Sequence, residues 1–240
     1  MNSLFGFLHN LSFMLVPLLA AVVFHEYAHG RVAYFLGDPT AKSLGRLTLN
    51  PLPHIDMYGS IIFPLILFLI PGGFIFGWAK PVPINTERLH NPKRDMALVA
   101  IAGPLMNLFL AIVSGLLLAL FWSIDPTLKE NWPPQPGVEL RGDLLGMILV
   151  PLSAMALFSM LINIALFAFN LLPIPPLDGS RVLVSILPPK QAIALNRLER
   201  HGMLVVMGLI MVNSYIPILS MYLGSIQNLF FQVFLSKFWS

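Results

Sequence analysis

The chain has no cysteine and very little charge. Charged residues make up only 10% of its 240 residues, against roughly 25% in soluble domains, while 57% are hydrophobic. Without cysteine the chain can form neither disulfides nor thiolate metal sites, so a bound metal must use His, Asp, Glu or water. The low charge and a mean hydropathy of +0.79 exclude an ordinary soluble domain. The sequence therefore predicts an all-α polytopic membrane protein.

A basic N-terminal region, an internal repeat and a long polar linker are also missing. The first ten residues carry no Lys or Arg and no small-residue cleavage site follows them, so we expect the first apolar segment to remain as a helix. The polar connections leave no room for an inserted soluble domain, and we expect a single membrane domain over residues 1–240. The net charge of +3 is spread over several loops, so we expect no nucleic-acid partner.

Four apolar runs approach the length needed to cross a hydrocarbon core of roughly 30 Å. They are Leu11–Phe35, Met96–Trp122, Leu144–Leu172 and Met203–Phe238. The last run is broken near Pro217 or Gly224 and can hold two short helices. Another apolar stretch, Tyr58–Ala79, either spans or is re-entrant. We therefore expect about five to six transmembrane helices in a multi-pass protein of the cell (inner) membrane.

The region after the first helix predicts a small membrane-associated β or re-entrant element. Short alternation occurs in Thr40–Asn50, and Lys80–Asn85 alternates prolines with apolar residues, as an edge strand can. A re-entrant Tyr58–Ala79 puts ten Lys or Arg residues on one side of the membrane against two, whereas a spanning segment gives eight against four. The positive-inside rule therefore favours the re-entrant arrangement.

Two histidines and a glutamate lie inside the first apolar run, in the stretch VVFHEYAHGRVAYF. A charge at the bilayer centre costs roughly 2.5–3.5 kcal/mol or more, so ionisable residues there indicate a functional site. His25 and His29 are four residues apart, which places both on one face of a helix, and Glu26 lies beside them. This HExxH pattern supplies two zinc ligands and a general base.

A catalytic zinc site needs a third protein ligand. The polar candidates are Asp56, His54, His90, Asp178, Glu199 and His201. Asp178 closes the stretch NLLPIPPLDG, which follows an apolar helix directly and whose prolines unwind the chain. Irregular backbone at membrane depth is tolerated only when it is buried in protein or lines a watery cavity. Taken alone, Asp178 would be an ordinary turn residue.

Topology links Asp178 to the histidine pair. Both motifs lie at or after the C-terminal part of their helices, so these helices must run in the same direction if the motifs are to meet. An odd number of crossings between them is therefore required, and Met96–Trp122 alone provides it if Tyr58–Ala79 is re-entrant. The crossing helix opens with AGPLMN, in which we interpret Asn107 as a packing residue first and a functional residue second.

Together, HEYAHG, GRLTLNPLPHID, FGWAKPVPIN, AGPLMN and NLLPIPPLDG resemble the site-2 protease family of intramembrane zinc metalloproteases, in a compact microbial form without PDZ or CBS domains. The resemblance implies that His25, His29 and Asp178 bind one Zn²⁺, that Glu26 is the catalytic base, and that Asn170 lies near the scissile peptide. It implies hydrolysis of peptide bonds in or near transmembrane segments of membrane-protein substrates within the lipid bilayer. Substrate identity and oligomeric state stay open.

Three alternatives stay open at this stage. A membrane metal transporter or metal-binding protein would also place His, Glu and Asp at the midplane, although transporters commonly carry repeated halves and this chain has a single HExxH. A membrane-anchored zincin could use Glu199 as its third ligand in the cytosol. A catalytically inactive relative could keep the fold for binding alone.

Overall fold

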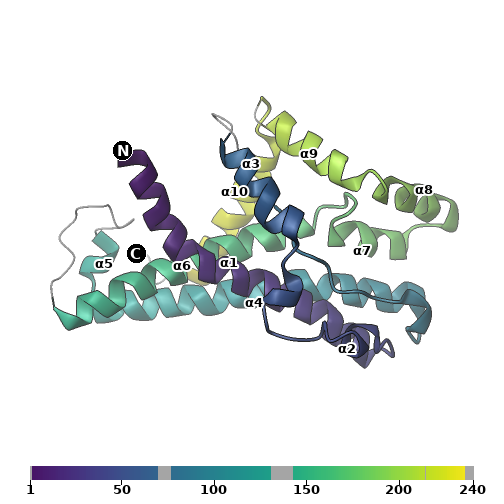
Figure 1. The fold of residues 1–240 in the computed structure, drawn as a ribbon, viewed down its shortest axis with the longest axis horizontal. Helices are drawn as coiled ribbons and strands as arrows, with labels where there is room; N and C mark the ends of the chain where they lie inside the picture. Colours follow the sequence, from purple (N-terminus) through teal and green to yellow (C-terminus); the bar gives the residue numbers. More distant parts are fainter. Residues whose placement is uncertain (1, 70–76, 131–142, 214, 236–240) are drawn as a thin grey trace.

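Three long helices form the centre of the protein, which we describe from a computed structural model covering residues 2–69, 77–130, 143–213 and 215–235. They are α1 (Asn2–Phe35), α4 (Pro92–Ile124) and α6 (Leu144–Asn170). Each of the three contacts the other two. Figure 1 shows α4 and α6 side by side with α1 lying across them.

Local signals in the sequence start two of these helices. Pro92 occupies the first turn of α4, where its missing N–H is not needed. Asp95 then accepts a hydrogen bond from the Asn91 backbone N–H at 2.7 Å. In the same way, Asp143 caps α6 by accepting from the Gly146 N–H at 2.9 Å. These caps satisfy backbone donors that the helix itself cannot pair.

The long helices are apolar on their outward faces, as expected of a protein in lipid. Exposed residues on α4 and α6 include Leu105, Phe109, Leu116, Leu120, Met147 and Ile148. Their inward faces pack into a core that α10 (Ile218–Phe230) completes. This core contains Ala111, Leu118, Trp122, Ala156, Leu157, Met160, Ile164 and Phe230. The chain is therefore a membrane protein whose interior is built mainly by α4 and α6.

The described residues contain three helices long and apolar enough to span a membrane, Leu11–Phe35, Pro92–Ile124 and Leu144–Asn170. The number rises to four if α9 (Gly202–Asn213) and α10, which meet at an 86° bend, count as one broken span. The prediction of five to six spans is thus not supported. Each half of the last apolar run is only 12 or 13 residues long, shorter than the roughly 20 residues that a span requires.

The remaining helices are short. Before α4 they are α2 (Thr40–Ser43), η1 (Leu52–His54), η2 (Met57–Ile62), α3 (Phe63–Leu69) and η3 (Thr86–Arg88). After it come α5 (Thr127–Glu130), α7 (Asp178–Ile186), α8 (Pro189–Glu199) and η4 (Phe231–Leu235). Of these, α7 packs against α4, and the two lie together in Figure 1.

The two ends of the apolar stretch Tyr58–Ala79 lie together. The Trp78 backbone N–H donates to the Gly59 carbonyl at 3.1 Å, and the Ser60 hydroxyl donates to the Trp78 carbonyl at 2.9 Å. Residues 70–76 lie outside the described residues. A stretch that crossed the bilayer once would end roughly 30 Å from its start, so the joined ends agree with the re-entrant arrangement.

The predicted β element is not supported, because no strand occurs in the part of the chain that the structure describes. Thr40–Asn50 begins with the short helix α2 and continues as turns. Lys80–Asn85 has no regular secondary structure and no ladder partner among the described residues. The alternation seen in the sequence was therefore too short to specify strand pairing.

Backbone groups of Lys80–Asn85 pair with side chains and, at the Lys80 N–H, with the backbone carbonyl of His54 at 2.9 Å. The N–H of Val82 donates to the carboxylate of Glu26 at 2.7 Å, and the N–H of Asn85 donates to Asp38 at 2.7 Å. Arg46 Nη2 donates to the first two carbonyls of the segment at 2.9 and 3.1 Å. Two prolines in the segment have no N–H to contribute to a ladder. These contacts fix the segment beside the HExxH turn of α1.

Candidate metal centre

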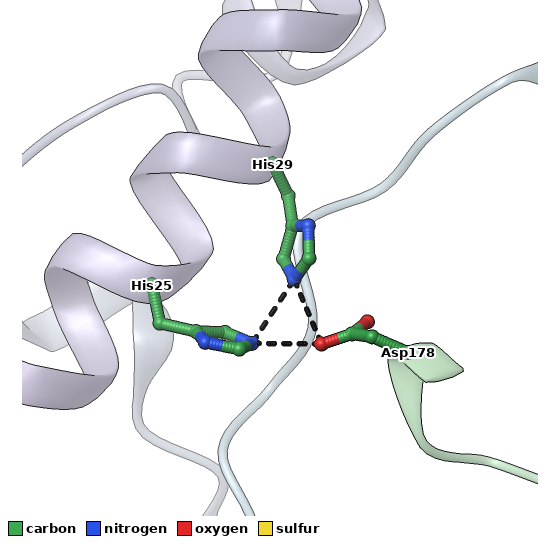
Figure 2. A group of neighbouring side chains, drawn as sticks. All are labelled: His25, His29 and Asp178. Carbon is green, nitrogen blue, oxygen red and sulfur yellow. Dashed lines mark hydrogen bonds and ion pairs between the residues drawn. The ribbon is translucent and has the colours of Figure 1, made fainter. Parts of the chain in front are cut away.

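Two imidazoles and one carboxylate converge where α1 meets the start of α7 (Figure 2). His25 and His29 lie one turn apart on α1, and Asp178 is the first residue of α7. The two Nε2 atoms are 3.0 Å apart. Asp178 Oδ2 lies 3.1 Å from His25 Nε2 and 3.3 Å from His29 Nε2, and all three residues are buried. The single-crossing topology therefore brings the two motifs together.

The Nδ1 atom of each imidazole makes a hydrogen bond away from the centre. His29 Nδ1 donates to the backbone carbonyl of Val99 at 2.7 Å. His25 Nδ1 donates to the side-chain oxygen of Asn107 at 2.6 Å. Because a carbonyl oxygen only accepts hydrogen bonds, each Nδ1 carries a proton and each Nε2 of the neutral ring is left with a lone pair. Such partners orient metal-binding histidines in many proteins.

The three facing atoms fit a zinc ion. Two imidazole nitrogens and a carboxylate oxygen lie 3.0–3.3 Å apart, and a cation between them, either a shared proton or a metal ion, offsets the repulsion of their lone pairs. Tetrahedral zinc with bonds of roughly 2.0–2.1 Å needs ligand atoms about 3.3–3.4 Å apart. Oδ2 of Asp178 is buried and has no hydrogen-bond donor in the structure. Three protein ligands leave a fourth position for water or substrate.

The charge state of Asp178 suits a metal ligand. Burial opposes ionisation of this carboxyl, but the attraction of His29 and His25, which act on it as protonated imidazoles when no metal is bound, outweighs burial and keeps its pKa below the ordinary value. The carboxyl is therefore ionised at neutral pH. A metal ligand of this type must be deprotonated.

Two glycines allow the backbone to come close enough to build this centre. A Cβ atom on Gly103 of α4 would lie 2.3 Å from His29 Nε2 and 2.6 Å from His25 Cε1. A Cβ atom on Gly179 would lie 2.3 Å from the carbonyl oxygen of Leu171, at the end of α6. No larger residue fits at either position without displacing the imidazoles or the turn that carries the aspartate.

Glu26 is half-buried on α1 between the two histidines in sequence. Its Oε2 atom accepts the hydrogen bond from the Val82 N–H at 2.7 Å. Residues 81 and 83 are both proline, so Val82 supplies the only backbone donor in this stretch of three residues. Glu26 thus adjoins His25 along α1 with one carboxylate oxygen held by Val82, and its role as general base stays a prediction.

Asn170 is the last residue of α6 and is half-buried. Its amide Nδ2 donates to the Leu166 carbonyl of its own helix at 3.0 Å. The predicted role of Asn170 near a scissile peptide stays a prediction. The loop and surface candidates for a third ligand make other contacts, as seen for Asp56, His54 and Glu199. Within the described residues, His25, His29 and Asp178 are the one group arranged to hold a metal.

Asn107 has a contact at the metal centre that the sequence did not predict. The sequence favoured a packing role for it, yet its side-chain oxygen accepts a hydrogen bond from His25 Nδ1. An isolated amide in an apolar helix was a signal that a partner was needed, but the sequence could not say which one. Only the crossing of α1 and α4 identifies that partner as His25.

Comparison with known proteins gives a consistent result. Residues 13–213 match the family model described as Peptidase family M50. The chain is 36% identical over 226 residues to "Putative zinc metalloprotease YwhC" of Bacillus subtilis, covering 92% of both proteins.

More distant relatives carry similar names. The chain is 30% identical over 193 residues to "Putative zinc metalloprotease Rip2" of Mycolicibacterium smegmatis, covering 80% of this chain and 64% of Rip2. It is 29% identical over 169 residues to "Putative zinc metalloprotease MJ0611" of Methanocaldococcus jannaschii, covering 70% of this chain and 68% of that protein. No solved structure gives a significant match.

Proposed function

The chain belongs to peptidase family M50, the site-2 protease family of zinc metalloproteases, and we propose that it is an intramembrane endopeptidase with one zinc ion held by His25, His29 and Asp178. The observation that supports this most strongly is the convergence of two Nε2 atoms and one carboxylate oxygen within 3.3 Å. Both Nδ1 atoms make hydrogen bonds elsewhere, so Nε2 is the nitrogen of each ring that faces the centre and can bind a metal.

In this proposal Glu26 is the general base. Bound zinc supplies Lewis acidity toward the scissile carbonyl and the attacking water. Glu26 takes a proton from that water as oxygen adds to the carbonyl carbon, and it later gives the proton to the leaving amine as the C–N bond breaks. The hydrogen bond from Val82 to Oε2 keeps the carboxylate from rotating away between these two transfers.

Asn170 is proposed to stabilise the oxyanion that develops on the scissile carbonyl. Its Nδ2 donates to Leu166 at the C-terminal end of α6, where a rotation of the side chain can redirect the amide. A donor of this kind is worth about 2.7–4 kcal/mol in other hydrolases. We therefore expect Asn170→Ala to lower the cleavage rate by about 100- to 1,000-fold while zinc stays bound.

Membrane-protein segments are the proposed substrates. The apolar outer faces of α4 and α6 support a lipid bilayer as the environment of the protein, and we propose the cell (inner) membrane as its location, with the site at membrane depth. A transmembrane helix hides its carbonyls in hydrogen bonds, so it must unwind locally before hydrolysis. We therefore expect cleavage near helix-weakening residues such as Gly, Ser, Asn or Pro. Residues 1–240 act in this proposal as a single domain.

The test is cleavage of a model transmembrane substrate by the purified full chain in liposomes, with zinc counted per chain. We expect Glu26→Gln to bind zinc normally and to lose cleavage. Glu199→Gln is the matched control, because it removes an exposed carboxylate paired with Arg181 and leaves the metal centre unchanged. A chelator should abolish cleavage, and added zinc should restore it.

Other results would contradict the assignment. Zinc binding without cleavage of any substrate containing helix-weakening residues would favour a metal transporter or binding protein. Cleavage that survives Glu26→Gln would remove Glu26 from the role of base. A folded chain that binds no zinc would refute the metal centre itself.

A further inference from the structure

Two buried asparagines connect the metal centre to the interface between α4 and α6. Asn107 on α4 and Asn163 on α6 expose only 0% and 1% of their surface. Asn107 accepts from His25 Nδ1 through its oxygen at 2.6 Å. Through its nitrogen it donates to the side-chain oxygen of Asn163 at 2.8 Å. Asn163 is thus connected to the proposed zinc ligand His25 through Asn107.

Backbone carbonyls fix the orientation of both amides. Asn107 Nδ2 also donates to the carbonyl of Ala21 at 3.2 Å, and Asn163 Nδ2 donates to the carbonyl of Ser159 at 2.8 Å. Since a carbonyl cannot donate, the NH₂ group of each amide must face it. The oxygen of Asn163 is therefore directed at Asn107, and the oxygen of Asn107 is directed at His25.

This orientation has a consequence for the metal. If the Asn107 amide were reversed, its NH₂ group would face His25 Nδ1, which would then have to be the unprotonated nitrogen. The ring proton would move to Nε2, the atom that faces His29 and Asp178. A protonated Nε2 cannot bind a metal.

We propose that Asn107 and Asn163 act as positioning residues that keep the proton of His25 on Nδ1 and so keep its Nε2 free to bind zinc. The inference rests on the zinc site proposed above and extends it to α6. Asn107 acts directly on His25, and Asn163 acts only through Asn107. The loss of such an outer partner commonly weakens metal binding by about 10- to 100-fold.

The experiment measures zinc affinity of the full chain in detergent by competition with a chelator, with the unfolding midpoint of the zinc-free protein measured in parallel. We expect Asn107→Leu to weaken zinc binding about 10- to 100-fold. Asn107→Asp should bind zinc more tightly than Asn107→Leu, because a carboxylate also accepts the Nδ1 proton, but less tightly than the wild type, because it cannot donate to Ala21 and Asn163. Asn163→Leu should weaken binding by less than Asn107→Leu, and the double variant should be no weaker than Asn107→Leu alone.

Ser114→Ala is the matched control. Ser114 is also buried on α4 and donates to the Ser159 hydroxyl of α6 at 2.8 Å. Asn163 Nδ2 shares that hydroxyl at 3.3 Å but keeps its 2.8 Å bond to the Ser159 carbonyl, so the loss of Ser114 leaves the bonds from His25 to Asn107 and from Asn107 to Asn163 in place. We expect this variant to lower the unfolding midpoint and to leave zinc affinity unchanged. If the asparagine variants behave in the same way, their role is structural only and the inference is overturned.

The outcomes also separate this inference from the proposed function. If the wild type binds zinc, His25→Ala abolishes binding and Asn107→Leu has no effect, the zinc site stands and the positioning pair is refuted. If Asn163→Leu weakens binding equally in the presence and absence of Asn107, Asn163 does not act through Asn107. Where Asn107→Leu does not fold, Asn163→Leu and Asn107→Asp decide the question. A wild type that binds no zinc refutes both proposals.

Discussion

The carboxylate of Glu26 accepts a 2.7 Å hydrogen bond from the backbone N–H of Val82, which lies in a loop far along the chain from α1. Carboxylate acceptors form some of the stronger hydrogen bonds in proteins, worth roughly 1.5–3 kcal/mol. Val82 therefore connects the loop that follows the apolar stretch Tyr58–Ala79 to the proposed catalytic base.

Removing this donor should impair catalysis without removing zinc. Val82→Pro deletes the N–H, and we expect the cleavage rate to fall by about 10- to 100-fold, which corresponds to the free energy of one charge-assisted hydrogen bond. The measurement is cleavage rate at equal zinc content. Val82→Ala is the control, because it keeps the N–H and loses only side-chain packing against Gly30. Equal rates for the two variants would show that the donor is unimportant.

Gly103→Ala should destroy the metal centre. The added methyl group would lie 2.3 Å from His29 Nε2, closer than any real contact, so the imidazoles must move apart. We expect zinc per chain to fall close to zero, as measured by metal analysis after gel filtration. Gly208→Ala is the matched control, since a Cβ there meets nothing within 4 Å and alanine favours a helix by about 1 kcal/mol. Retained zinc in Gly103→Ala would contradict the geometry of the site.

Zinc should stabilise the fold, because it binds a centre that only the folded chain assembles. At a free concentration of 100 times the dissociation constant, such a ligand adds about 2.7 kcal/mol to the free energy of unfolding. Thermal unfolding in detergent should therefore shift upward with added zinc and downward with chelator. The control is Asp178→Ala, which should show no shift. A zinc-dependent shift that persists in this variant would place the metal elsewhere.

Asp38 should control the order of the segment Lys80–Asn85. It is fully buried and accepts from the Asn85 N–H at 2.7 Å and from the backbone and hydroxyl of Thr40. Asp38→Ala leaves these donors unpaired, at a cost of about 1–3 kcal/mol each. We expect faster hydrogen exchange in peptides covering this segment, with zinc still bound.

The matched control for that experiment is Asp143→Ala, which removes a carboxylate cap at the start of α6. It should lower the free energy of unfolding by about 1 kcal/mol and leave exchange in Lys80–Asn85 unchanged. If both variants accelerate exchange equally, Asp38 does not hold the segment specifically.

Features with a local physical cause could be predicted from the sequence. Spacing of four residues places His25 and His29 on one face of any α-helix, whatever surrounds it. Three of the four long apolar runs occur as candidate membrane spans, because lipid leaves a backbone few structures other than a helix. The distribution of Lys and Arg between the loops favoured a re-entrant Tyr58–Ala79. The hydrogen bond between Trp78 and Gly59, at the two ends of this stretch, agrees with that arrangement.

Other expectations failed because local patterns do not determine partners. The alternation in Lys80–Asn85 suits an extended chain, but it cannot say whether its backbone groups pair with a strand or with side chains. Here they pair with Glu26, Asp38 and Arg46, so no sheet forms around this segment. The number of spans was overestimated for a related reason, since two short helices at an 86° bend share one apolar run.

By itself, then, the sequence determined the membrane-embedded helices and the pair of imidazoles that face one way from α1. The sequence motifs also pointed to Asp178 as the third ligand, and the tertiary structure brings its carboxylate to the two imidazoles. Only the tertiary structure decided that Asn107 receives the proton of His25. The physical reason is that helix periodicity acts over a few residues, whereas these contacts depend on how α1, α4, α6 and α7 pack.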